Sequence, residues 1–296
     1  RKYGIYCKWG LGFLGRSMGL DSKVWNKIGE MKSRISGILL MVLLVVGGGL
    51  MCYPGISQYL AGRNHSEVIR EYQKITEGVS KAEEKQLIEK AEEYNKSLYS
   101  VLKKENHMSE DFQNLNQNYE KLLDIEGTGV MGYIEIPQIT VYLPIYHEGE
   151  NALEKGAVHL MNTSLPVGGE NTHAVLSAHT GYPRAQMFDN LTQLKEGDLF
   201  FLYILKKKMV YQVDQIRIVS PEDIEELEIQ EGKEYVTLLT CYPYGMNTHR
   251  LLVRAHRVED GMEEEQKQVQ RTDVPKEESW GGIYGIPIIL AVAAIV

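Results

Sequence analysis

The sequence is poor in cysteine, and of its three cysteines only Cys241 falls in the part expected to lie outside the cell. A lone thiol there cannot form an intramolecular disulfide. The chain has no low-complexity tract and no internal repeat, so it reads as an ordinary folded protein. Its net charge of -8 combines a basic N-terminal tail with an acidic outer part. No basic face is visible on the folded part, which argues against binding to nucleic acid. No spacing of acidic residues demonstrates a metal site, and we expect no cofactor.

A run of apolar residues at 35–53 carries no charge and is about long enough to span a bilayer. Basic residues outnumber acidic ones just before this run, and Arg63 is the first basic residue after it. This asymmetry predicts a cytoplasmic tail at 1–34, a transmembrane anchor at 35–53 and an extracellular remainder on the cell membrane. A cleaved signal peptide is the alternative, but no small-x-small cleavage site is evident.

A second apolar run occupies residues 281–296, after an acidic, polar stretch at 261–280 that we interpret as a linker. The run is too short to span a bilayer comfortably. We expect a second transmembrane segment that is cut short by the end of the sequence. A short buried helix is the other interpretation.

Residues 54–126 are predicted to form a helical N-terminal extension. Apolar residues follow helical spacing twice in this region, and Glu and Lys occupy the other face. An amphipathic hairpin packed on a domain is the favoured interpretation, and a stalk or partner-binding coil is the alternative. The polar stretch 103–112 has no clear period and is predicted to be a loop.

From residue 127 to about 260 the pattern changes to short strands bounded by Gly, Pro, Asn or charged turns. The predicted strands lie at 131–136, 141–146, 174–178, 198–205, 209–219, 235–241 and 250–258. Short helical pieces fit near residue 153 and between 187 and 194. So many strands with few helices predict a mainly β domain, either a sandwich or a closed barrel.

Three polar residues stand at expected strand ends: His179, Cys241 and Arg250. A thiol near neutral pH needs an ionisable partner, and histidine is the usual one. Acyl transfer also needs a donor at the developing oxyanion, which a guanidinium supplies with charge. Taken singly, each has a structural explanation: a buried small thiol, a histidine satisfied at a turn and a surface ion pair.

The stretch at 237–254, Thr-Leu-Leu-Thr-Cys-Tyr-Pro-Tyr-Gly-Met-Asn-Thr-His-Arg-Leu-Leu-Val-Arg, resembles the active-site signature of the sortases, in particular the pilus-assembling class C. Further matches occur at 132–137, 143–147, 164–169 and 188–191, and the resemblance covers roughly 94–258. It implies a closed eight-stranded β-barrel with N-terminal helices, flanked by membrane segments.

Carried over by position, the resemblance makes Cys241 the nucleophile, His179 the general acid/base and Arg250 the residue that binds the oxyanion or orients the substrate. It implies cleavage of an LPxTG-like sorting signal at Thr-Gly and transfer of the acyl group to a pilin lysine. The partners would be pilin subunits or other LPxTG-bearing surface proteins. His147, His159 and His173, in expected loops, are poorer candidates.

Class C sortases carry an N-terminal lid with an Asp-Pro-aromatic motif, whereas this chain has Glu110-Asp111-Phe112 without the proline. The hypothesis is a reduced lid, with the Asp111 carboxylate near Arg250 or Cys241 and the Phe112 ring over the cleft. An ordinary loop is the alternative.

Two other functions stay open. One is a sortase that attaches surface proteins to the peptidoglycan cross-bridge, which would share the triad and use another amine. The other is a non-catalytic, membrane-tethered binding module in which Cys241 is merely buried.

Overall fold

The computed structural model describes residues 22–104, 109–149 and 151–258. The chain divides into two compact units, with the boundary after Leu60. The acidic stretch at 261–280 and the second apolar run at 281–296 lie outside the described residues.

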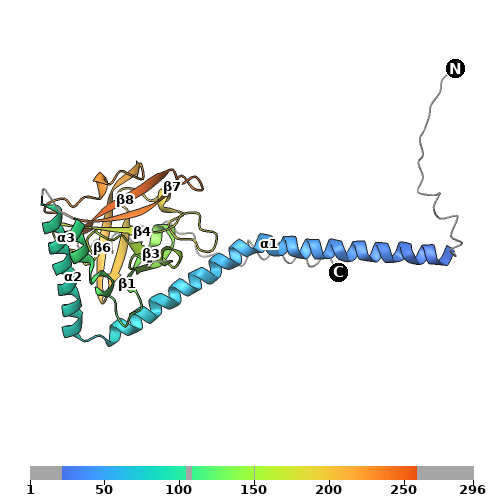
Figure 1. Cartoon of the computed structure of the whole chain (residues 1–296), viewed down its shortest axis with the longest axis horizontal. Helices are drawn as coiled ribbons and strands as arrows, with labels where there is room; N and C mark the ends of the chain where they lie inside the picture. Colours follow the sequence, from blue (N-terminus) through green and yellow to red (C-terminus); the bar gives the residue numbers. More distant parts are fainter. Residues whose placement is uncertain (1–21, 105–108, 150, 259–296) are drawn as a thin grey trace, which may run out of the picture. The chain divides into compact units, whose positions relative to one another are not determined.

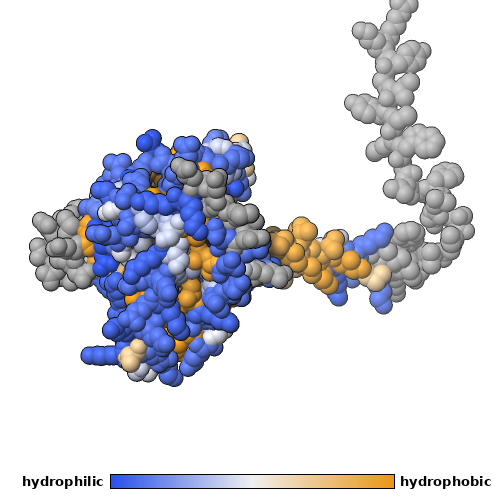
Figure 2. Space-filling model, turned by 60° about the vertical axis from the view of Figure 1, so that its left-hand side comes forward, coloured by the Kyte–Doolittle hydropathy of each residue, from blue (hydrophilic) through white to orange (hydrophobic). Residues whose placement is uncertain are grey.

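The helix α1, Ser22–Gly78, is 57 residues long and passes through the boundary between the two units. The predicted anchor and the first predicted extracellular helix are therefore one continuous helix. Within the first unit its apolar side chains are exposed, as the orange stretch in Figure 2 shows. Among the described residues it is the one helix long and apolar enough to cross a membrane, which makes it a candidate membrane anchor.

In the second unit, α1 ends at Gly78 and α2, Lys81–Leu102, follows almost directly. Ser80 caps α2 by accepting a hydrogen bond from the Glu83 N–H at 3.2 Å. The Asn95 side chain bonds both backbone groups of Leu165, at 2.7 and 3.0 Å, and thereby fixes α2 to the domain. The Tyr72 hydroxyl, on α1, donates to the Met131 carbonyl at 2.9 Å.

The stretch predicted as a loop at 103–112 is partly helical, because α3 spans Ser109–Asn116. Phe112 and Leu115, three residues apart, pack against the hydrophobic core. A two-residue apolar face is too short to produce a helical period in the sequence. Packing against α2 therefore determines the structure of this segment.

Eight strands form a closed barrel in the order β1-β2-β3-β4-β7-β8-β6-β5, with α2 and α3 at its side (Figure 1). The barrel alternative is thus confirmed over the sandwich. The strands are β1 Val130–Ile136, β2 Val141–Tyr146, β3 Ala157–His159, β4 Thr172–Ser177, β5 Leu199–Ile204, β6 Lys207–Val219, β7 Glu234–Tyr242 and β8 His249–Val258.

Two pairs of neighbouring strands are parallel, β2 with β3 and β4 with β7, and the other pairs are antiparallel. The prediction missed β3, whose three residues are too few to show alternation. The helical pieces predicted near residue 153 and between 187 and 194 are 3-10 turns, at Ala152–Glu154 and Leu191–Gln193. Alternate strand residues fill the interior, where Ile134, Leu176, Leu238 and Val253 are fully buried.

Candidate active site

Cys241 and Arg250 are direct partners on the antiparallel strands β7 and β8. Directly opposed residues of an antiparallel pair project from the same face of the sheet. Both side chains are half-buried, and Cys241 is a free thiol. A short β-hairpin therefore holds a thiol beside a guanidinium at the rim of a rigid barrel.

The turn that joins the two strands fixes the Arg250 guanidinium. Its Nη1 donates to the Asn247 carbonyl at 3.2 Å and to the His249 carbonyl at 3.0 Å. The Pro243 carbonyl closes the turn by accepting from the N–H groups of Met246 and Asn247, at 3.1 and 3.0 Å. Because these bonds use one end of the guanidinium, its remaining N–H groups can face a reacting carbonyl.

His179 follows β4, which pairs in parallel with β7 up to Ser177 and Leu239. Continuing that register by two residues brings His179 alongside Cys241. Two bonds extend the pairing past the strand end: the Ala178 N–H donates to the Leu239 carbonyl at 3.2 Å, and the Thr240 hydroxyl donates to the Ala178 carbonyl at 2.8 Å. The three predicted residues therefore come together at the same end of β4, β7 and β8.

The turn that carries His179 is braced by Asp189, whose carboxylate accepts from the Gly181 N–H at 2.8 Å and from the Met187 N–H at 2.9 Å. The His179 carbonyl accepts from the Phe188 N–H at 3.0 Å. In the sequence, Asp189 belongs to the matched stretch at 188–191 and has no assigned role. Aspartate often accepts hydrogen bonds from nearby backbone N–H groups in turns, but nothing in the sequence connects Asp189 to His179.

Gly181 has a backbone φ of +73°. A Cβ there would lie 3.2 Å from ring carbons of Tyr244, which belongs to the turn between β7 and β8. The backbone angle therefore favours glycine at this position, and a side chain here would also displace the exposed Tyr244 ring slightly. The close approach of the ring joins the turn after His179 to the turn between Cys241 and Arg250.

The structure places the two hypothetical lid residues on α3. The Asp111 carboxylate pairs with the Lys104 ammonium at 3.4 Å, and Phe112 packs against the core. The placement of these two residues over the cleft stays a prediction.

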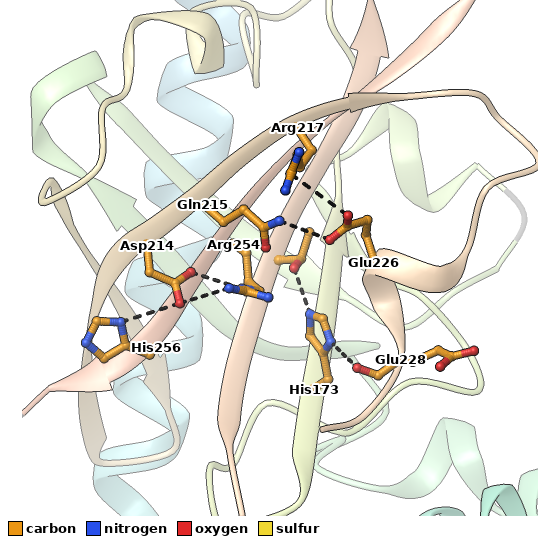
Figure 3. Close-up of polar contacts among 9 residues, drawn as sticks. His173, Asp214, Gln215, Arg217, Glu226, Glu228, Arg254 and His256 are labelled. Carbon is orange, nitrogen blue, oxygen red and sulfur yellow. Dashed lines mark hydrogen bonds and ion pairs between the residues drawn. The ribbon is translucent and has the colours of Figure 1, made fainter. Parts of the chain in front are cut away.

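His159 and His173 lie in β3 and β4 rather than in loops, contrary to expectation, and both are buried. Burial lowers the pKa of His173. Its Nδ1 lies 3.0 Å from the Glu228 carbonyl and its Nε2 lies 2.7 Å from the Thr237 hydroxyl (Figure 3). A carbonyl only accepts, so Nδ1 carries the hydrogen and Nε2 of the neutral ring accepts from Thr237. His173 thus anchors the loop between β6 and β7.

Further along the same strands, Arg254 forms a bidentate pair with Asp214, at 3.0 and 3.2 Å, as Figure 3 shows. The Arg254 guanidinium also lies 4.3 Å from the centre of the Tyr235 ring. Arg254 therefore has a structural role. Arg250, in contrast, lies directly opposite Cys241 in the strand register. This difference distinguishes the two arginines of the motif.

A family model, the sortase domain, matches residues 134–258. The chain is similar to the crystal structure of sortase C1 from Streptococcus agalactiae, at 44% identity and a TM-score of 0.60, over 66% of this chain and 99% of that one. A structure of sortase C from Clostridium perfringens with the C-terminal cell wall sorting motif matches at 44% identity and a TM-score of 0.56, over 66% and 99%.

A structure of sortase C from Streptococcus pneumoniae, described in terms of catalysis and pilin substrate specificity, is 40% identical, with a TM-score of 0.57 over 65% of this chain and 97% of that one. Sortase D of Bacillus subtilis is 34% identical over 132 residues, which is 43% of this chain. The chain spans 63% of the length of that relative.

The closed barrel and the sequence match define a sortase, and the chain belongs to this family of cysteine transpeptidases. Within the family, the solved structures that it resembles at 40–44% identity are class C sortases.

Proposed function

We propose that the chain is a membrane-anchored, pilin-polymerising transpeptidase. In this proposal it cleaves an LPxTG-like sorting signal between Thr and Gly and joins the acyl group to a pilin lysine. The observation that carries the proposal is the cross-strand pairing of Cys241 with Arg250 beside the strand that leads to His179. The class C structures that resemble the chain support the choice of pilin as substrate.

In the first half-reaction, the Cys241 thiolate attacks the threonine carbonyl carbon of the sorting signal and forms a C–S bond. The carbonyl oxygen takes up the negative charge, which the Arg250 guanidinium stabilises. The C–N bond to glycine then breaks as the His179 imidazolium gives its proton to the leaving amine. The products are a thioester on Cys241, a neutral imidazole and the released C-terminal peptide.

In the second half-reaction, the ε-amine of a pilin lysine attacks the thioester carbonyl carbon. The C–S bond breaks, the Cys241 thiolate leaves, and His179 takes the proton that the amine loses. The result is an isopeptide bond between two polypeptides, and the enzyme regains its starting charges. Division of the transfer into two steps allows an amine to compete with water for the acyl group.

The substrate class is supported by the Clostridium perfringens structure with its sorting motif. The localisation is supported by the apolar part of α1, together with the basic residues that precede it. We propose that this part of α1 anchors the chain in the cell membrane and that the barrel is extracellular. Asp111 and Phe112 are retained in the proposal as a reduced lid that loosens before substrate enters.

The test is mass spectrometry of the full chain in detergent, incubated with an LPxTG peptide, beside the variant Cys241→Ala. The expected result is a thioacyl adduct on the Cys241 peptide and its loss in the variant. Peptide cleavage that persists in Cys241→Ala would overturn the assignment of the nucleophile. A Cys241 that resists both the peptide and small alkylating reagents would favour the binding module.

The acceptor is tested in the same reaction by addition of either a lysine-bearing pilin domain or a cross-bridge peptide. Pilin polymerisation predicts that the thioester is consumed by the pilin lysine and that an isopeptide-linked product accumulates. Consumption by the cross-bridge peptide alone would identify the chain as a sortase that attaches proteins to the cell wall.

A further inference from the structure

The ring of Tyr182 stacks on the imidazole of His179. Their centroids are 5.2 Å apart and the planes differ by 20°. The two residues are three positions apart, and the tight turn through Gly181 folds one back over the other. The stack covers one face of the histidine that the barrel register aligns with Cys241.

The Tyr182 ring is held in place from behind. Tyr182 packs against the hydrophobic core, and its carbonyl accepts from the Ala185 N–H at 3.3 Å. Asp189 fixes the backbone on either side of the turn through Gly181 and Met187. The turn that carries the ring is therefore braced by its backbone bonds, and the ring itself packs on the core.

A planar aromatic ring supports an imidazole in two ways. Contact between the faces restricts rotation of the imidazole, which keeps its nitrogens aligned with the thiol and with the leaving amine. The negative face of the tyrosine ring also attracts the imidazolium more than the neutral ring. The imidazolium is the form that accompanies a thiolate and that protonates the leaving amine in the proposed mechanism.

We propose that Tyr182 is a positioning residue for His179, one that orients the imidazole and favours its charged form. This inference rests on the proposed function of His179 as general acid and base. Only the ring is required, because the stacking contact involves the faces of the two rings.

Other charged and titratable groups also surround His179. The strand register places Cys241, on β7, beside it and Arg250 on the next strand, β8, while Asp189 lies in its own turn with both oxygens bound to backbone N–H groups. Beyond Tyr182 lies a cavity of ≈ 210 Å³, whose lining includes Lys155, Arg184, Glu154 and the buried His65. Because these groups stay the same in a Tyr182 variant, a change in pH profile reports the loss of the ring.

The test compares Tyr182→Ala and Tyr182→Phe in the full chain, with Tyr142→Ala as a control. Tyr142 is a partly exposed tyrosine on β2 that contacts Tyr133 edge to face. The first measurement is alkylation of Cys241 by iodoacetamide from pH 5 to 9, read at the Cys241 peptide by mass spectrometry. The second is kcat and KM for LPxTG peptide cleavage.

Tyr182→Ala is expected to slow alkylation at neutral pH by roughly two- to fivefold, from loss of attraction between the ring and the imidazolium. The onset of alkylation should move to higher pH, because thiolate forms less readily without a favoured imidazolium. kcat should fall roughly tenfold with little change in KM, as expected when a catalytic group loses orientation. Tyr182→Phe should retain wild-type behaviour, and Tyr142→Ala should match wild type.

An unchanged pH profile and kcat in a folded Tyr182→Ala would overturn the proposal, as would a Tyr182→Phe variant as impaired as Tyr182→Ala. Tyr182 already borders an open cavity, so truncation should not leave a sealed void. If Tyr182→Ala nevertheless unfolds, Tyr182→Leu keeps most of the volume without an aromatic face and gives the same comparison. Alkylation needs no sorting peptide, so failure of this proposal is distinguishable from a wrong substrate.

Discussion

Cys241 and Arg250 are cross-strand partners in the hairpin formed by β7 and β8. The residues between them form a turn whose carbonyl groups accept hydrogen bonds from the guanidinium. The position of Arg250 relative to the thiol is therefore fixed by strand register and by its own turn. Such preorganisation is what stabilisation of a developing oxyanion requires.

Replacement of Arg250 tests this arrangement. Arg250→Ala should lower kcat for sorting-peptide cleavage by roughly 10²- to 10³-fold, the usual cost of losing an oxyanion donor. Arg250→Lys should recover only part of that loss, because an ammonium cannot bond the turn carbonyls and the oxyanion with the same planar fork. Arg70→Ala, an exposed change on α1, is the control. Activity of Arg250→Ala within twofold of wild type would contradict the assigned role.

Asp189 offers a second test, because one carboxylate accepts two backbone N–H groups in the turn after His179. Asp189→Ala should lower the free energy of unfolding by about 1–3 kcal/mol and slow formation of the thioacyl adduct. Asp189→Asn keeps an acceptor and should be milder in both respects. Denaturant unfolding and the rate of adduct formation are the measurements.

Asp198→Ala is the matched control, since its carboxylate accepts from the backbone N–H of Lys195 in another loop. It should reduce stability without slowing adduct formation. Equal adduct rates in wild type and Asp189→Ala would mean that the turn does not position His179.

The sequence was sufficient for strands rich in β-branched and aromatic residues and bounded by turn residues, such as β2 and β6, whose observed bounds lie within two residues of the predicted ones. It was insufficient for β3 and α3, which are short and depend on packing with neighbours. The motif containing Cys241 and Arg250 is recognisable because both residues lie in one hairpin. Tyr182 and Asp189 could not be assigned, because their relation to His179 exists only after the turn folds.

The buried His159 should make stability depend on pH. Burial lowers its pKa to about 4, against an ordinary value of 6.5. Between these two values the unfolded chain binds more protons than the folded one, so the free energy of unfolding falls as the pH falls. The loss from this residue is fully developed below pH 4 and should be on the order of 3 kcal/mol.

Chemical denaturation at pH 4, 5, 6 and 7 measures this dependence. His159→Gln removes the titrating group and should flatten the slope between pH 4 and 6.5. His249→Gln is the control, because His249 is exposed on β8 and its removal should leave the slope unchanged. A slope that is the same in His159→Gln and in wild type would show that other groups cause the acid sensitivity.

The lid proposal makes the last prediction. If Asp111 and Phe112 restrict entry to the cleft, the double variant Asp111→Ala/Phe112→Ala should raise the rates of Cys241 alkylation and of peptide cleavage. Lys104→Ala is an informative companion, because it removes the described ion-pair partner of Asp111 while leaving both lid residues in place. If the pair with Lys104 holds the lid segment in place, Lys104→Ala should loosen the lid and raise both rates, as the double variant does. Unchanged rates in the double variant would contradict the lid proposal. Phe112 would then serve only to pack against the hydrophobic core.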